Sequence, residues 1–379
     1  MSDATKVSIR AVPDAAQLPQ DKRNDDASVT SQIVAFATGL QFDDVPAAVV
    51  ATLKRHLLDT IGCAAAGAHL DVSRAAVAAG AAMEGKDGAE HVIEKKPRAG
   101  SKQAGCHVFG SATQFGPATA TFINATMTNA LDFDDGVEIN GKGLGHPSAS
   151  LVAAALAALD RYDCNGRDLL CALAAGYEIN NRLIASIQPS ARRFEQVYGI
   201  GQHQSLGACI VYGLLAGLSE ECLHGALGLA GALTGLPSLH KYNWQSRPIV
   251  SFKDGVGPAA LAGVNAVLLA KAGFVGSRDI LDGPQGLWRM LGSDRFASDL
   301  LCDGLGERWW TTFGSIKLFP ACRWLAPALE AFETLRERHS LLADDIERIE
   351  VKTFGKVARD ARRGAIVGFA GGDHPRAAL

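Results

Sequence analysis

The chain has 379 residues, which fits one large domain or two smaller ones. Apolar residues make up 47% and aromatic residues only 7%, so a sizeable core must be filled mainly by Ala, Leu, Val and Ile. The net charge of −3 gives no bulk argument for nucleic acid or an anionic membrane as a partner.

The N-terminal residues are polar and carry charges of both signs, with prolines at 13 and 19. They lack the apolar segment of a signal peptide and are too acidic for a typical transit peptide. The apolar run at 151–159 is much shorter than a membrane-spanning helix. We therefore expect a disordered tail over residues 1–28 and a cytoplasmic protein.

Helical patterns follow from residue 29 to about residue 274. The segment VPAAVVATLKRHLLDTIGCAAAG has apolar residues at helical spacing, and its Pro46 suits a first helical turn. The alanine-rich sequence after His146 predicts several more helices, one of which starts at Ser219, before two glutamates. These patterns predict a mainly α fold with a large all-helical domain over residues 29–274.

The composition changes near residue 275. An aromatic stretch, GERWWTTFGSIKLFPACRW, is followed by LAPALEAFETLRERH, which predicts an amphipathic helix. IERIEVKTF then alternates as a strand does. We expect a smaller, lid-like α+β domain over residues 275–379. Residues 364–379 hold no convincing helix or strand to close a sheet, so we expect this domain to be incomplete.

The eight cysteines form no C-x-x-C pair, and most lie in apolar helical text. This spacing argues against a zinc ribbon, an iron–sulfur site and a secreted disulfide framework. Buried free thiols in a reducing compartment are expected instead.

One short loop gathers most of the ionisable chemistry: NALDFDDGVEINGKGLGHPSAS, residues 129–150. Counted from Asp132, it does not place Asp, Gly and Glu where an EF-hand needs them. A G-x-x-x-x-G-K match within it lacks the following Ser or Thr and the preceding apolar strand of a phosphate loop. The G-x-S-x-G elbow of serine hydrolases does not occur in the chain.

A carboxylate and a histidine between two helices can transfer protons without a metal. Three neighbouring aspartates repel one another, which favours a retained proton on one of them. The His146 imidazole titrates in the range that acid–base catalysis needs. The residues alone leave a structural alternative open, in which the aspartates cap helices and the His-Pro turn only starts one.

LDFDD followed by GHPSAS and an alanine-rich helix resembles the MmgE/PrpD family. That family includes 2-methylcitrate dehydratases, cis-aconitate decarboxylases and an iminodisuccinate epimerase. LKRHLLDTIGCAAAG, VYGIGQHQSLGACIVYGLLAGL, SFKDGVGPAALAG and WWTTFGSIKLFPACRW are similar to further family segments, so the resemblance covers residue 31 to about residue 355. It implies a homodimer and a small di- or tricarboxylate substrate. Because the sequence spells out no metal cluster, we expect chemistry without a metal or cofactor.

The resemblance implies site residues at matching positions. For catalysis we expect His146 to transfer the proton at carbon, Asp132 to orient it, Lys253 to neutralise charge and His203 to act as a second acid. The expected substrate-binding residues are Lys317, Cys322, Arg323 and, from its position near Lys253, Arg247. Structural roles stay open for His203 and Arg323 and are favoured for Arg247. The other histidines, among them His56, are expected to be structural or exposed.

Departures from the family pattern bear on the activity. Gly136 stands where the decarboxylases carry Thr, Cys322 stands where they carry His, and the 14-residue spacing from Asp132 to His146 is longer than theirs. We therefore expect a cofactor-independent hydro-lyase that dehydrates a hydroxy di- or tricarboxylate of the 2-methylcitrate type. A decarboxylase, an epimerase and a truncated non-catalytic remnant remain alternatives, because family members continue past the smaller domain with a segment not found here.

Overall fold

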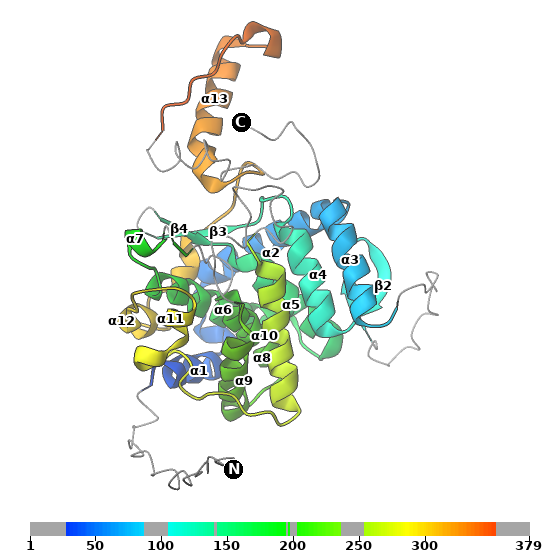
Figure 1. Ribbon diagram of the computed structural model, residues 1–379, viewed down its shortest axis with the longest axis vertical. Helices are drawn as coiled ribbons and strands as arrows, with labels where there is room; N and C mark the ends of the chain where they lie inside the picture. Colours follow the sequence, from blue (N-terminus) through cyan, green and yellow to red (C-terminus); the bar gives the residue numbers. More distant parts are fainter. Residues whose placement is uncertain are drawn as a thin grey trace, which may run out of the picture.

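The computed structural model describes residues 28–86, 105–139, 142–194, 196–197, 203–235 and 254–353 (Figure 1). These residues form thirteen α-helices and five short strands, which confirms the predicted mainly α fold. None of the described helices has the length and apolar character needed to cross a membrane. The predicted tail lies outside the described residues except for Ser28, and so do the site candidates Arg247 and Lys253.

The N-terminal part consists of three helices, α1 (Val29–Gly39), α2 (Ala47–Gly67) and α3 (Asp71–Met83). The first turn of α1 is capped twice. The Ser28 hydroxyl accepts a hydrogen bond from the Ser31 backbone N–H. The Asp282 carboxylate accepts bonds from the backbone N–H groups of Val29 and Thr30, at 2.7 and 3.2 Å. The chain after α10 is thereby fixed to the first helix.

Helix α2 is present as its sequence predicted, and it begins directly after Pro46, which is the N-cap residue and not part of the first turn. It buries Val49 and Leu53, whereas Leu58 is 73% exposed. The apolar stripe that faces the core is therefore narrower than the run of apolar residues in the sequence. His56 on the same helix is buried, and it points to the site described below.

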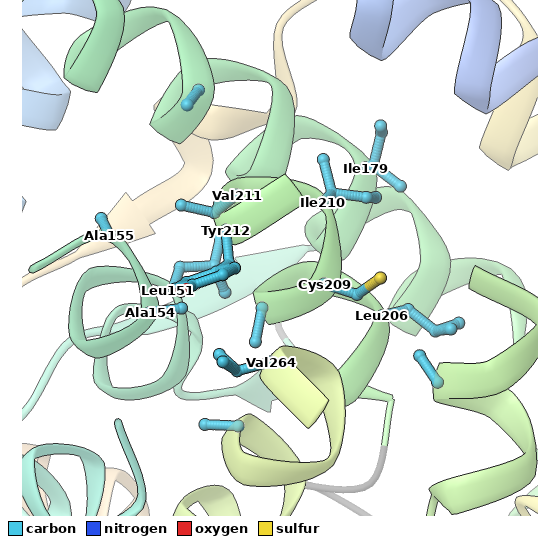
Figure 2. Close-up of a cluster of buried hydrophobic side chains, with 14 of the residues drawn as sticks. Leu151, Ala154, Ala155, Ile179, Leu206, Cys209, Ile210, Val211, Tyr212 and Val264 are labelled. Carbon is cyan, nitrogen blue, oxygen red and sulfur yellow. The ribbon is translucent and has the colours of Figure 1, made fainter. Parts of the chain in front are cut away.

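The centre of the molecule is a bundle of helices, namely α4 (Pro117–Asn129), α5 (Pro147–Arg161), α6 (Gly166–Ser186), α8 (Gln204–Leu215), α9 (Glu220–Leu233) and α10 (Val256–Lys271), with the short α7 (Ala191–Phe194) beside it. Leu151, Val211 and Val264 from three of these helices belong to one buried cluster (Figure 2). A Cβ atom on Gly263 would lie 2.3 Å from the Ser205 carbonyl oxygen, so only glycine lets α10 approach α8 this closely. Small residues thus replace aromatic bulk in this core, as the composition indicated.

Three helices of the bundle begin at the same end of the molecule. The Ser150 hydroxyl in the first turn of α5 donates a hydrogen bond of 2.6 Å to the side-chain oxygen of Gln204, the first residue of α8. Asp254, just before α10, lies 3.6 Å from His146, just before α5. The N-termini of α5, α8 and α10 are therefore neighbours.

Two small antiparallel sheets complete the fold. Strands β1 (Cys106–Val108) and β2 (Ser111–Phe115) form a hairpin, and β4 (Lys142–Gly145), β3 (Gly136–Ile139) and β5 (Gly314–Ser315) form a sheet in that order. Val137 pairs with Gly145, and Gly136 pairs with Ser315. This second sheet brings the acidic loop, His146 and the segment after residue 313 together.

The residues after α10 run over the helical bundle through α11 (Leu287–Met290) and α12 (Ser298–Cys302). Trp309 is buried in the main core, whereas α13 (Ala326–His339) has no buried residue and extends away from the bundle (Figure 1). The helix predicted over LAPALEAFETLRERH is thus present. The strand predicted in IERIEVKTF is absent from the described residues 346–353, where no neighbouring strand offers hydrogen bonds. The domain boundary near residue 275 stays a prediction.

Candidate active site

The acidic loop connects α4 to β3 and is almost completely buried. Asp132, Asp134 and Asp135 all have buried side chains. Asp132 adopts a left-handed backbone with φ of 52°, a conformation that Asp tolerates better than most residues but that still costs about 1 kcal/mol. Its backbone N–H bonds to the Asn129 carbonyl at 3.1 Å. The chain therefore turns sharply at Asp132 and carries its side chain toward Lys317.

Lys317 provides the cation for this turn. Its ammonium group donates to the Asp132 backbone oxygen at 2.8 Å and forms an ion pair with the Asp132 carboxylate. Both side chains are buried, so neither charge is compensated by bulk water. The pairing of β5 with β3 places Lys317 there, two residues after the strand ends.

His146 lies at the start of α5 and has a defined orientation. Its Nδ1 atom is 2.8 Å from the Asp135 backbone oxygen, which can only accept a hydrogen bond, so we assign the ring proton to Nδ1. Nε2 then carries a lone pair in the neutral ring. An Asp134 carboxylate oxygen lies 3.7 Å from Nδ1, and an Asp254 oxygen lies 3.6 Å from Nε2. A bare Nε2 atom is the form in which histidine acts as a base.

Asp135 is the buried support of this arrangement. One carboxylate oxygen accepts the Ser148 backbone N–H at 3.0 Å, and the other accepts His56 Nδ1 at 2.8 Å and the Tyr177 hydroxyl at 3.2 Å. Burial works to raise the pKa of Asp135, but the hydrogen bond and charge of His56 hold that pKa below its usual range. Burial likewise works to lower the pKa of His56, and Asp135 raises it above its usual value. Both shifts favour the ionic form of this pair, which fixes the loop against α2 and α5.

His203 immediately precedes α8 and is fully buried. Within the described part of the chain, neither ring nitrogen has a hydrogen-bond partner. Burial lowers the pKa of His203 to about 3, so its ring is neutral at physiological pH. A neutral imidazole can still donate from its N–H, which is compatible with the predicted role as second acid. That role stays a prediction.

Arg323 and Cys322 follow β5 and lie near the sheet. Arg323 Nη1 donates to a Glu138 carboxylate oxygen at 2.9 Å and also to the Ser315 hydroxyl. Its guanidinium lies over Gly136, where a Cβ atom would stand only 1.9 Å from Nη2. Nη2 is buried and has no partner among the described residues. Cys322 is half-buried.

One group of side chains has the spacing of a metal site. Single ligand atoms of Asp132, Asp134 and His146 lie within 4.8 Å of one another. The Lys317 ammonium group already bonds to Asp132 in this cluster and supplies a positive charge there. We therefore assign no metal to these residues.

The structure places three of the predicted site residues, Asp132, His146 and Lys317, in one cluster. Their catalytic and binding roles stay predictions. Sequence reasoning did not single out Asp254, and it left His56 among the structural histidines. The only available signal for Asp254 was its place next to the candidate Lys253.

Residues 31–298 match the model of the MmgE/PrpD N-terminal domain. The chain belongs to the MmgE/PrpD family.

The relatives found by comparison with curated proteins are distant from this chain in sequence. A cis-aconitate decarboxylase of Aspergillus terreus is 25% identical over 328 residues, which cover 83% of this chain and 62% of the relative. A cis-aconitate decarboxylase-like protein of Aspergillus oryzae is 25% identical over 332 residues, with 83% and 63% covered. The human cis-aconitate decarboxylase is 26% identical over 340 residues, with 86% and 64% covered. The chain thus spans a little under two thirds of the length of these relatives.

Proposed function

We propose that this MmgE/PrpD chain is a cofactor-independent lyase that acts on a small di- or tricarboxylate by moving a proton next to a carboxylate. The observation that carries the proposal is the His146 ring, whose Nδ1 proton is donated to the Asp135 backbone oxygen so that Nε2 is left as a base. Because β3 and β4 hold the loop ends together, the base stands beside the Asp132–Lys317 pair.

Dehydration of a hydroxy polycarboxylate is the reaction we favour. His146 Nε2 takes the proton from the carbon next to a carboxylate, and the electron pair of that C–H bond forms the new C=C bond. The hydroxyl group on the neighbouring carbon leaves as water after it receives a proton from an acid, for which His203 is the candidate. Atoms and charge balance without an oxidant or reductant.

Binding of the substrate carboxylates is supported by fixed positive charge. The N-termini of α5, α8 and α10 are neighbours near His146, and the positive ends of helix dipoles attract anions. In α5 the Ser148 N–H already bonds to Asp135. Arg323 adds a guanidinium whose Nη2 has no protein partner within the described residues. Lys253, Cys322 and Arg247 remain proposed parts of the site. The homodimer and the cytoplasmic location also remain proposals.

Decarboxylation is the second candidate, and the similarity to cis-aconitate decarboxylases favours it. In that reaction the C–C bond to a carboxylate breaks, CO2 leaves, and the electron pair stays on the carbon, which takes a proton from His146 in its imidazolium form. The same residues would serve both reactions, because each passes through negative charge next to a carboxylate.

Proton NMR in D2O with 2-methylcitrate, citrate and cis-aconitate tests the proposal. Loss of water, loss of CO2, and deuterium entry alone would identify a dehydratase, a decarboxylase and an epimerase-type proton transfer, respectively. His146→Gln is expected to lower the rate at least about 100-fold, because general acid–base catalysis contributes about 10²–10⁴-fold. His69→Gln, at an exposed position, is the matched control and should keep the wild-type rate. A folded wild-type protein that converts none of these substrates would contradict the proposal.

A further inference from the structure

Asp254 lies opposite the reactive nitrogen of His146. It directly precedes Gly255, whose positive φ of 75° starts α10. One Asp254 carboxylate oxygen is 3.6 Å from His146 Nε2 and 3.4 Å from the side-chain nitrogen of Asn129. The Asp254 side chain is buried, so water screens its charge only weakly.

The contact of 3.6 Å between an Asp254 carboxylate oxygen and His146 Nε2 depends on whether the ring is protonated. In the neutral ring, Nε2 offers a lone pair to a carboxylate oxygen that also offers lone pairs, so no hydrogen bond forms and the contact is repulsive. Once Nε2 takes a proton, the same two atoms become the donor and acceptor of a charge-assisted hydrogen bond. Asp254 therefore interacts favourably with the protonated ring alone, and such an interaction lowers the barrier to proton transfer.

Asn129, the last residue of α4, holds this carboxylate in place. Its side-chain nitrogen donates to both Asp134 carboxylate oxygens, at 3.2 and 3.1 Å, and to Asp254. One uncharged amide thereby bridges two carboxylates that lie near different nitrogens of the His146 ring, Asp134 near Nδ1 and Asp254 near Nε2. An ionisable residue at 129 would add charge to this cluster, whereas asparagine only orients it.

We propose that Asp254 is a positioning residue for His146: its carboxylate stabilises the imidazolium that forms when Nε2 takes a proton, and Asn129 holds that carboxylate in place. This inference deepens the proposed function, since it rests on His146 as the base. The other charged groups of the described residues around the ring belong to the acidic loop and the segment after β5. They are Asp132, Asp134, Asp135 through its backbone oxygen, and Lys317.

The first measurement needs no turnover. The His146 imidazole resonance of histidine-labelled protein is assigned by its disappearance in His146→Gln and is then followed through a pH titration. In Asp254→Asn its titration midpoint is expected to fall by about one pH unit or more, because a neighbouring opposite charge is lost. Asp254→Glu should restore most of the shift. The exposed Asp163→Asn, a matched control, should leave the midpoint unchanged.

The second measurement separates binding from chemistry. In Asp254→Asn we expect kcat to fall about tenfold, the equivalent of one pH unit of imidazolium stabilisation, and the acidic limb of the pH–rate profile to move to lower pH. KM should stay unchanged or fall, because the variant removes an anion that repels the substrate carboxylates. A purely structural role would instead lower the melting temperature without moving the acidic limb.

The outcomes distinguish the two proposals. A His146 midpoint that stays in place in a folded Asp254→Asn protein overturns the role of Asp254, whatever the activity. If the wild type converts no polycarboxylate, the proposed function fails, and the titration still decides whether Asp254 stabilises the imidazolium. Asp254→Ser provides a second neutral variant should Asp254→Asn fail to fold.

Discussion

Arg182 of α6 is the strongest single tie between the helical bundle and the segment that leads to Lys317. Its side chain is fully buried, and its Nε atom donates to a Glu178 carboxylate oxygen at 2.6 Å. Its two terminal nitrogens donate at 2.7–3.2 Å to four backbone oxygens, those of Leu300, Asp303, Gly304 and Arg308. The other Glu178 oxygen accepts from the Thr311 backbone and hydroxyl. The guanidinium and its carboxylate thus hold the turn before β5.

Replacing this residue has a cost that follows from those contacts. Arg182→Met leaves Glu178 buried without its cation and leaves four backbone oxygens without their donor. Loss of one partner of a buried ion pair costs about 3–5 kcal/mol, so we expect the free energy of unfolding to fall by that amount. Arg182→Lys should cost less, about 2 kcal/mol, because an ammonium keeps the charge but offers three donors in place of five.

Urea unfolding followed by circular dichroism measures these differences. Arg167→Met is the matched control, because its ion pair with Asp43 is exposed: the Arg167 side chain is 57% exposed and the Asp43 side chain 83%. Exposed pairs contribute about 0–1 kcal/mol, so the control should be nearly neutral. Adding Glu178→Gln to Arg182→Met should recover part of the loss, since it removes the uncompensated buried charge. If the two methionine variants differed by less than about 1 kcal/mol, the reasoning from burial would be wrong.

Three further predictions concern the site and its surroundings. Gly136→Ala should raise KM about five- to tenfold, because the added Cβ atom displaces the Arg323 guanidinium. In an Arg323→Ala background the same change should have no further effect on KM. A double-mutant cycle in steady-state kinetics measures this difference. Burial and the Asp135 charge raise the pKa of Asp59 to about 6. Ionised Asp59 therefore destabilises the fold increasingly as pH rises from the ordinary pKa of an aspartate to about 6. Asp59→Asn should therefore stabilise the protein at pH 8 by about 1 kcal/mol after discounting for solvent screening, with no gain at pH 4. If the variant and the wild type had equal urea midpoints at both pH values, this prediction would be contradicted. Treatment with EDTA should leave activity unchanged because Lys317 supplies the cation at Asp132, and a loss that added Zn²⁺ or Mg²⁺ reversed would refute that role.

The helices were largely predictable because their signal is local. Periodic apolar residues and the proline before α2 indicate a helix whatever its neighbours are, and the capping pattern at Ser219 did begin α9. The buried face of α2 was less predictable, since Leu58 fits the helical spacing but meets solvent. Which apolar residues face the core depends on where other helices pack, and that information is not local.

The family resemblance indicated which residues belong to the site, but not how the chain brings them together. Asp132 and His146 are 14 residues apart, and the sequence did not indicate how that distance closes. The structure closes it with the β3–β4 hairpin, in which Val137 pairs with Gly145. Short strands of this kind carry little periodic signal, so neither the hairpin nor its pairing with β5 was expected.

Tertiary contacts also explain how three neighbouring aspartates can be buried together despite the repulsion between their charges. Each buried aspartate of the loop has a different polar partner: Asp132 has the Lys317 ammonium, Asp135 has the His56 ring, and Asp134 has the uncharged Asn129 amide. These partners come from the segment after β5, from α2 and from α4, so the loop can form only when all three have packed against it. The His146 ring lies near two carboxylates, with Asp134 3.7 Å from Nδ1 and Asp254 3.6 Å from Nε2, so the negative charge around it favours its protonation.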